Sequence, residues 1–148
     1  AINDVLEEAV GFCEHLIRDS GVSIERNYAS DLPKVNAVPG QLHQVFVNVI
    51  TNACNAADER GGVIRLRTRL LGHDQVRIDV EDHGVGIDPT DLDRVFEPFF
   101  STRRRGQGTG LGLSIVKSIV ERHRGRIDIE SQPGKGTLVQ ITVPCIDS

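Results

Sequence analysis

The sequence predicts a two-layer α/β sandwich, in which a mixed, mostly antiparallel sheet is covered on one face by helices. Some segments have an apolar residue at every second position, and others have apolar residues three or four positions apart, as strands and helices do. The strand segments follow one another without regular βαβ alternation, which favours antiparallel pairing. A length of 148 residues, 39% of them hydrophobic and 26% charged, fits one globular domain, residues 1–148.

The first half of the chain is expected to form two helices and a strand. Residues 4–19 have helical apolar spacing, with Asn3 as a candidate N-cap and Gly21 as the terminating residue. Residues 21–28 then alternate as a short strand. The clearest helix runs from Gln41 to Glu59, where the apolar residues follow helical spacing almost without interruption.

The second half is expected to contain four strands and two helices. The alternating segments predict strands at 64–70, 75–82, 126–131 and 137–143, the last two joined by a tight turn at 133–136. Helical pieces are expected at 90–95 and at 112–123. The stretch from 84 to 112 is otherwise rich in Gly and Pro, as loops are.

Charge and cysteine content indicate which kinds of partner and cellular setting the protein has. A formal charge of -4 without any long run of Lys and Arg argues against a nucleic-acid partner, because that mode needs a basic face. The three cysteines are odd in number and lie in apolar segments, so we expect reduced core residues in a cytoplasmic setting. No apolar run approaches the roughly 18 residues of a membrane span, and no direct membrane contact is expected.

Asparagines stand out on the helix from 41 to 59. Asn48 and Asn52 lie one turn apart beside the apolar stripe, with Asn55 and Gln41 on the same side. Asn costs about half a kcal/mol relative to Ala in a helix, and an ordinary solvated face would use Glu, Lys or Arg instead. Carboxamide oxygens converging on one place suit a hard cation such as Mg²⁺ that also carries phosphate oxygens. The alternative is a polar helix edge that happens to be rich in Asn.

A second unusual residue is Asp82, which shares strand parity with core positions and should therefore point inward. Gly84 and Gly86 follow, and would let a flat ligand lie against the backbone. A buried carboxylate can accept from the exocyclic amine of adenine and repels the carbonyl oxygen of guanine. Thr137 also points inward by parity and could assist. Alternatively, Asp82 caps a tight turn, and Thr137 is a core residue whose hydroxyl is hydrogen-bonded within the protein.

The third feature is GQGTGLGLSIV, in which glycines at 106, 108, 110 and 112 run directly into an apolar helix. Free backbone N–H groups at such a helix start favour phosphate. The Rossmann pattern fails here because its third glycine is replaced by Leu. The Walker A pattern fails around Lys135, where Ile129 replaces the first glycine and Gly136 replaces the Ser or Thr. A flexible linker is the alternative for these glycines.

Between these features lies FEPFFSTRRR, with three of the five phenylalanines of the chain. Phenylalanines packed at the ends of a loop whose outer part carries Ser, Thr and three arginines are what a ligand-gated lid over phosphates requires. A hydrophobic anchor with a solvated basic tip is equally compatible with this segment.

Taken in order, these features resemble the histidine kinase branch of the GHKL ATPases. NVITNACNAA is similar to the N box, DHGVGI to the G1 box, FEPFFST to the F box and GTGLGLSIV to the G2 box. The likeness covers residues 1–145, including GKGTLVQITVP, which looks like the closing strand of the family. The resemblance implies the GHKL fold and the ATP-binding catalytic domain of a two-component sensor kinase, separated from its dimerisation and sensor domains.

Residue roles follow from the same resemblance. Asn52 would hold Mg²⁺, Asn48 would lie near the phosphates, and Arg103 stands where a lid Lys or Arg often meets the γ-phosphate, so these three are the implied catalytic residues. Asn55 occupies the region where many members carry a phosphate-binding Lys or Arg, so the lid arginines supply that contact or it is missing. The implied ATP/ADP-binding set is Asn52, Asn55, Asp82, Gly84, Gly86, Phe100, Thr102, Gly108, Thr109, Gly110, Leu111, Gly112 and Thr137.

One departure bears on the chemistry. Related ATPases and anti-sigma serine kinases carry Glu at the position of Asn48, where it can act as a general base. Asn cannot, so we expect slow or absent hydrolysis and a nucleophile supplied by a partner. The phosphoacceptor His of the family is followed by an acidic residue, whereas His15 is followed by Leu16. The implied partners are a dimerisation and phosphoacceptor domain and a response regulator. An anti-sigma-type serine kinase and a non-catalytic nucleotide-binding module remain alternatives.

Overall fold

The computed structural model describes residues 2–57, 62–87, 89–92, 94–97 and 112–145. Helices and strands alternate irregularly along the chain, as the sequence predicts. The elements are α1 (Ile2–Phe12), α2 (Glu14–Ser20), β1 (Val22–Tyr28), α3 (Pro39–Ala56), β2 (Gly62–Leu71), β3 (Gln75–Asp82), α4 (Pro89–Leu92), α5 (Gly112–Arg122), β4 (Arg126–Gln132) and β5 (Gly136–Pro144).

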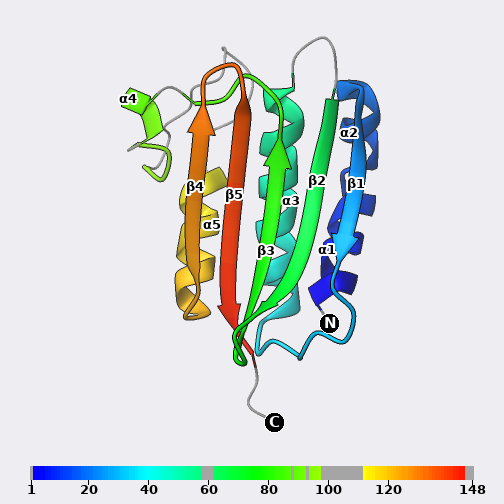
Figure 1. Ribbon diagram of the computed structural model, residues 1–148, viewed down its shortest axis with the longest axis vertical. Coiled ribbons are helices and arrows are strands. Elements are labelled where there is room, and N and C mark those ends of the chain that lie inside the picture. The colour runs from blue at the N-terminus through cyan, green and yellow to red at the C-terminus, as the bar shows by residue number, and fades with distance from the viewer. Residues whose placement is uncertain (1, 58–61, 88, 93, 98–111, 146–148) are drawn as a thin grey trace.

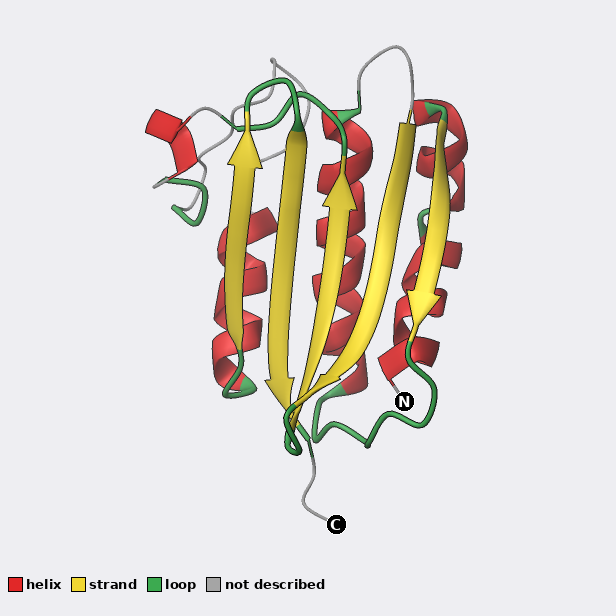
Figure 2. Cartoon of the chain, in the orientation of Figure 1, coloured by secondary structure: helices red, strands yellow, loops and turns green. Residues whose placement is uncertain are grey.

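The five strands form one sheet in the order β1-β2-β3-β5-β4. β1 pairs with β2 in parallel, and the other three neighbouring pairs are antiparallel. Helices α1, α2, α3 and α5 all lie behind the sheet in Figures 1 and 2, with α3 in the centre. The predicted two-layer sandwich with a mixed, mostly antiparallel sheet is therefore confirmed.

The core lies between the sheet and the helices. Phe46 and Ile50 of α3 are fully buried, as are Leu6 of α1 and the inward residues Ile64 and Leu66 of β2. Burying a side chain of this size contributes roughly 1.5–3 kcal/mol. Among the described helices, α3 buries the most apolar residues, so it contributes most to the attachment of the helix layer.

Details of the helical layer differ from the sequence prediction. The helical piece expected at 90–95 is limited to α4, Pro89–Leu92, and residues 94–96 form a turn. The helix expected at 4–19 is interrupted at Cys13, so that α1 and α2 are separate helices. Asn3 lies inside α1 and is not an N-cap, because its side chain makes tertiary hydrogen bonds instead. Its Nδ2 donates to the Ala29 carbonyl at 2.9 Å, and its Oδ1 accepts from the Thr68 hydroxyl at 2.8 Å. Gly21 ends α2 in the left-handed conformation with φ 75°, as expected.

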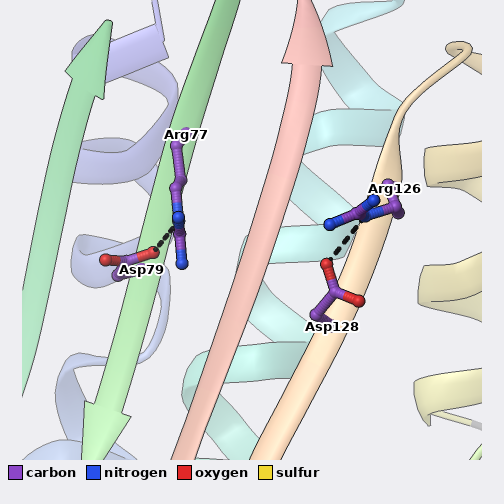
Figure 3. A network of polar contacts seen from close by, with 4 residues as sticks. All are labelled: Arg77, Asp79, Arg126 and Asp128. Atoms are coloured by element: carbon purple, nitrogen blue, oxygen red, sulfur yellow. Dashed lines mark hydrogen bonds and ion pairs between the residues drawn. The ribbon is translucent and has the colours of Figure 1, made fainter. Parts of the chain in front are cut away.

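The face of the sheet without helices carries charged side chains paired along single strands (Figure 3). On β3, Arg77 Nε lies 3.1 Å from Asp79 Oδ1, and on β4, Arg126 Nε lies 2.9 Å from Asp128 Oδ2. The β3 pair is largely covered, while the β4 pair is exposed, so the latter contributes little stability. The inward residues of β3, Asp82 among them, point to the opposite face, toward the helices.

None of the helices seen in the described ranges combines the length and apolar character needed to span a bilayer. All three cysteines are free, with Cys13 and Cys54 buried and Cys145 partly buried. The expectation of unpaired cysteines in the core is confirmed for the first two.

Candidate functional site

The asparagines of α3 lie on its C-terminal half and are all half-buried: Asn48, Asn52 and Asn55. The same helix buries Val49 and Ala53 against the sheet, so the carboxamides lie beside the apolar stripe, as predicted. Gly112, the first residue of α5, lies next to one of them. A Cβ added to Gly112 would be 3.7 Å from Nδ2 and 3.8 Å from Oδ1 of Asn52. The fold therefore brings the Asn52 carboxamide and the start of α5 together.

Asp82 is the last residue of β3, is 8% exposed and shares strand parity with the fully buried Ile78 and Val80, which confirms that it points inward. Its Oδ1 accepts the Gly84 backbone N–H at 2.9 Å, so the turn-capping alternative is also real. Burial raises the pKa of Asp82, opposed by hydrogen bonds from the Gly84 and Thr137 backbone. A carboxylate has about four acceptor sites, so Asp82 can cap the turn and still accept from a ligand.

Gly84 and Gly86 require glycine for a different reason from the one predicted. A Cβ on Gly84 would lie 2.1 Å from the carbonyl oxygen of Ala56, and a Cβ on Gly86 would lie 2.1 Å from that of Gln132. Gly86 also has φ +76°, which disfavours L-residues. The missing side chains thus make room for neighbouring backbone rather than for a ligand. That these residues line a nucleotide remains a prediction.

The loop after Asp82 is held by backbone hydrogen bonds on both sides. The Val85 N–H donates to the Ala56 carbonyl at 2.9 Å, and the Gly134 N–H donates to the Val85 carbonyl at 2.8 Å. The C-terminal end of α3, the end of β3 and the start of β5 lie together at the upper end of the sandwich in Figure 1. The asparagine-bearing helix and the strand that ends in Asp82 are therefore joined at this end.

Thr137 lies directly opposite Asp82 in the β3–β5 register, and Ser131 lies opposite Thr137 in the β5–β4 register. The Ser131 hydroxyl contacts Thr137 Oγ1 at 2.8 Å and accepts the Ile87 N–H at 2.7 Å. Sequence reasoning missed Ser131. The available signal was its parity with Ile127 and Ile129, which makes it an inward polar residue like Thr137.

Of the phenylalanine-rich segment, the structure describes Phe96, which is half-buried and packs against the core. Lys117 of α5 places its Nζ 4.8 Å from the centroid of the Phe96 ring, a cation–π contact that sequence reasoning did not identify. The remaining predicted site residues lie outside the described residues and stay predictions: Phe100, Thr102, Arg103, Gly108, Thr109, Gly110 and Leu111.

The described part of the site thus combines three kinds of group at one end of the sandwich. Asn52 offers a neutral oxygen to a cation, Asp82 offers a buried acceptor to an amine, and the start of α5 offers backbone N–H groups to an anion. The helix dipole of α5 adds to its attraction for negative charge. Groups of these three kinds can interact with an amine, an anion and a divalent cation.

The chain belongs to the family of histidine kinase-, DNA gyrase B- and HSP90-like ATPases, whose family model matches residues 37–146. Its relatives include sensor histidine kinases, so the resemblance drawn from the sequence motifs is confirmed. The chain is 35% identical over 143 residues to sporulation kinase E of Bacillus subtilis, covering 97% of this chain and 19% of that protein. It is 36% identical over 143 residues to the sensor histidine kinase ZraS of Klebsiella oxytoca, covering 97% and 30%. The chain therefore spans less than a third of these relatives.

Solved structures agree with this assignment. The mycobacterial sensor histidine kinase MprB superposes with a TM-score of 0.83 at 27% identity, over 96% of this chain and 93% of that one. The catalytic domain of histidine kinase ThkA gives a TM-score of 0.82 at 29% identity, over 96% and 91%. Full-length ShkA in complex with AMPPNP gives 0.84 at 27% identity, over 97% of this chain and 30% of that one.

Proposed function

We propose that this chain is a histidine kinase catalytic domain, residues 1–148, that binds Mg-ATP and transfers the γ-phosphate to a histidine on a separate dimerisation domain. The phosphoryl group would then pass to a response regulator. The observation that carries the proposal is the meeting of Asn52, the start of α5 at Gly112 and the loop after buried Asp82 at one end of the sandwich. Family membership and the AMPPNP complex of ShkA support nucleotide binding. Unpaired cysteines support a cytoplasmic setting.

In this proposal the nucleotide lies along the site from base to phosphates. Asp82 accepts from the exocyclic amine of adenine, assisted by Thr137, while the N–H groups at the start of α5 receive phosphate oxygens. The carboxamide oxygen of Asn52 is a hard, neutral donor of the kind that suits Mg²⁺ already carrying phosphate oxygens. When bound, the cation neutralises charge on the phosphates.

The chemistry proposed for this chain is positioning and charge neutralisation. Asn48 lies near the phosphates but cannot remove a proton, so hydrolysis by water is disfavoured. The incoming imidazole nitrogen forms a bond to the γ-phosphorus while the bond to the bridging oxygen breaks, and ADP leaves with that oxygen. Arg103 of the lid segment would neutralise charge on the transferring group.

Asn52→Ala tests the cation assignment. We expect ATP affinity in the presence of Mg²⁺ to fall about 10- to 150-fold, because one interaction with a charged partner contributes about 1.5–3 kcal/mol. Without Mg²⁺ the affinities of variant and wild type should converge. Isothermal titration with and without Mg²⁺ measures both. Gln44→Ala removes an exposed carboxamide from the same helix and is the matched control. An unchanged Mg²⁺ dependence in Asn52→Ala would make Asn52 a helix-edge residue only.

Phosphotransfer tests the reaction itself. Incubated with γ-labelled ATP, the domain alone should remain unlabelled, because it lacks both a general base at position 48 and a phosphoacceptor motif. Addition of the dimerisation domain of the same kinase should produce label on that fragment that is lost in acid, as phosphohistidine is. Acid-stable label on a partner serine would favour the anti-sigma alternative. Nucleotide binding without any transfer would favour the non-catalytic module, and label on His15 would contradict the two-part mechanism.

A further inference from the structure

Ser131 of β4 lies two strands away from Asp82 at the same level of the sheet, with Thr137 between them. Its strand neighbours Ile127 and Ile129 belong to or pack against the core, so Ser131 faces the helices as well. Neither the sequence motifs nor the family resemblance assigns it a role. Asp82, Thr137 and Ser131 therefore form a transverse row of polar side chains across three strands, at the edge of the candidate site.

The hydrogen-bond partners of Ser131 fix the direction of its hydroxyl proton. Its Oγ lies 2.7 Å from the Ile87 nitrogen, 2.9 Å from the Gly136 carbonyl oxygen and 2.8 Å from Thr137 Oγ1. The Ile87 N–H can only donate, and the Gly136 carbonyl can only accept. A serine hydroxyl has one proton and two acceptor sites. Its proton is therefore directed to Gly136, and one acceptor site is filled by Ile87.

This arrangement determines what Thr137 can do. The remaining acceptor site of Ser131 must receive the proton of the Thr137 hydroxyl, because Ser131 has no second proton to give. The Thr137 hydroxyl therefore donates its only proton to Ser131. Toward the candidate site, the Thr137 oxygen can then only accept a hydrogen bond. Asp82, immediately opposite, is an acceptor as well when ionised. The polar row thus presents two acceptors side by side.

We propose that Ser131 is a positioning residue for base selection, which acts through Thr137 by holding its hydroxyl as an acceptor. The inference rests on the proposed ATP-binding function and extends it to a residue outside the ligand contacts. The exocyclic amine of an aminopurine carries two N–H groups, one for each of the two acceptors, whereas an oxopurine places a carbonyl oxygen at that position and is repelled there. Without Ser131, the Thr137 hydroxyl can rotate and donate to that carbonyl oxygen, so discrimination weakens.

The test is the ratio of ATP affinity to GTP affinity, measured by titration of the whole chain in Mg²⁺. In Ser131→Ala the ratio should fall about 2- to 13-fold, the effect of altering one part-buried hydrogen bond. Ser131→Thr keeps the hydroxyl and should retain the wild-type ratio. If Ser131→Ala does not fold, Ser131→Cys, whose thiol is a weak donor and acceptor, should lower the ratio in the same direction.

A double-mutant cycle separates this role from simple support of the loop at Ile87. Ser131→Ala should not change the ratio further in a Thr137→Val background, because Ser131 acts through the Thr137 hydroxyl. Loop support alone would weaken ATP and GTP equally and leave the ratio of Ser131→Ala at the wild-type value, which would overturn the inference. Equal affinity of the wild type for both nucleotides would instead overturn the adenine assignment of the proposed function, so the two failures are distinguishable.

Discussion

Replacing Asp82 by alanine is expected to lower ATP affinity about 5- to 150-fold and to abolish the preference for ATP over GTP. The Asp82 carboxylate is buried, so in the variant the exocyclic amine of adenine would be buried without a hydrogen-bond partner. An unpaired buried polar group costs about 1–3 kcal/mol. GTP should gain relative to ATP, because the repulsion of its carbonyl oxygen is removed. Competition titrations with both nucleotides measure the affinity and the preference together.

Two further variants make this test specific. Asp79→Asn changes a carboxylate on the same strand with the same 8% exposure, but on the helix-free face, and should leave the nucleotide preference unchanged.

Asp82→Asn keeps an oxygen that can accept the Gly84 N–H while removing the charge. Because burial raises the pKa of Asp82, the folded state binds a proton more readily than the unfolded state. Stability is therefore lost as the pH rises through that pKa, and Asp82→Asn should not show this loss. A wild-type preference retained in Asp82→Ala would contradict the assignment.

The elements that could be predicted from the sequence are those with strong periodicity. The stripe containing Phe46 and Ile50 on α3 and the alternation of Ile64 and Leu66 on β2 have no competing interpretation, and both occupy the core. The inward direction of Asp82 followed from the same counting. Local pattern thus determined which face of each element is buried and, from that, the face on which the candidate site lies.

The features that were wrong or missed depend on contacts between distant segments. Asn3 has the local signal of an N-cap, yet it bonds to Ala29 and Thr68, far along the chain. The predicted reason for glycine at 84 and 86 was the close approach of a ligand, yet their missing side chains face protein backbone; that these residues line a nucleotide stays a prediction. Ser131 has no local signal beyond parity, since its partners are Ile87, in the loop after β3, and Gly136 and Thr137, at the start of β5. Spacing along the sequence cannot reveal such pairings.

Gly84→Ala should be the most destabilising of the substitutions considered. The new Cβ would lie 2.1 Å from the Ala56 carbonyl oxygen and 2.5 Å from its carbon, and both are backbone atoms that cannot rotate away. We expect a loss of about 3 kcal/mol or more and a Tm lower by about 10 °C, measured by circular dichroism.

The matched control is Gly11→Ala in α1, where a Cβ would meet nothing within 4 Å. That substitution should stabilise the protein by about 0.5–1 kcal/mol, because Ala restricts the unfolded chain and favours helix. Gly84 also joins two parts of the candidate site, since it presses the loop after Asp82 against the end of the helix that carries Asn52. Below its Tm, Gly84→Ala should therefore bind ATP more weakly than Gly11→Ala. Equal melting temperatures for the two variants would mean that the end of α3 and this loop can separate freely, and that their contact does not hold the site together.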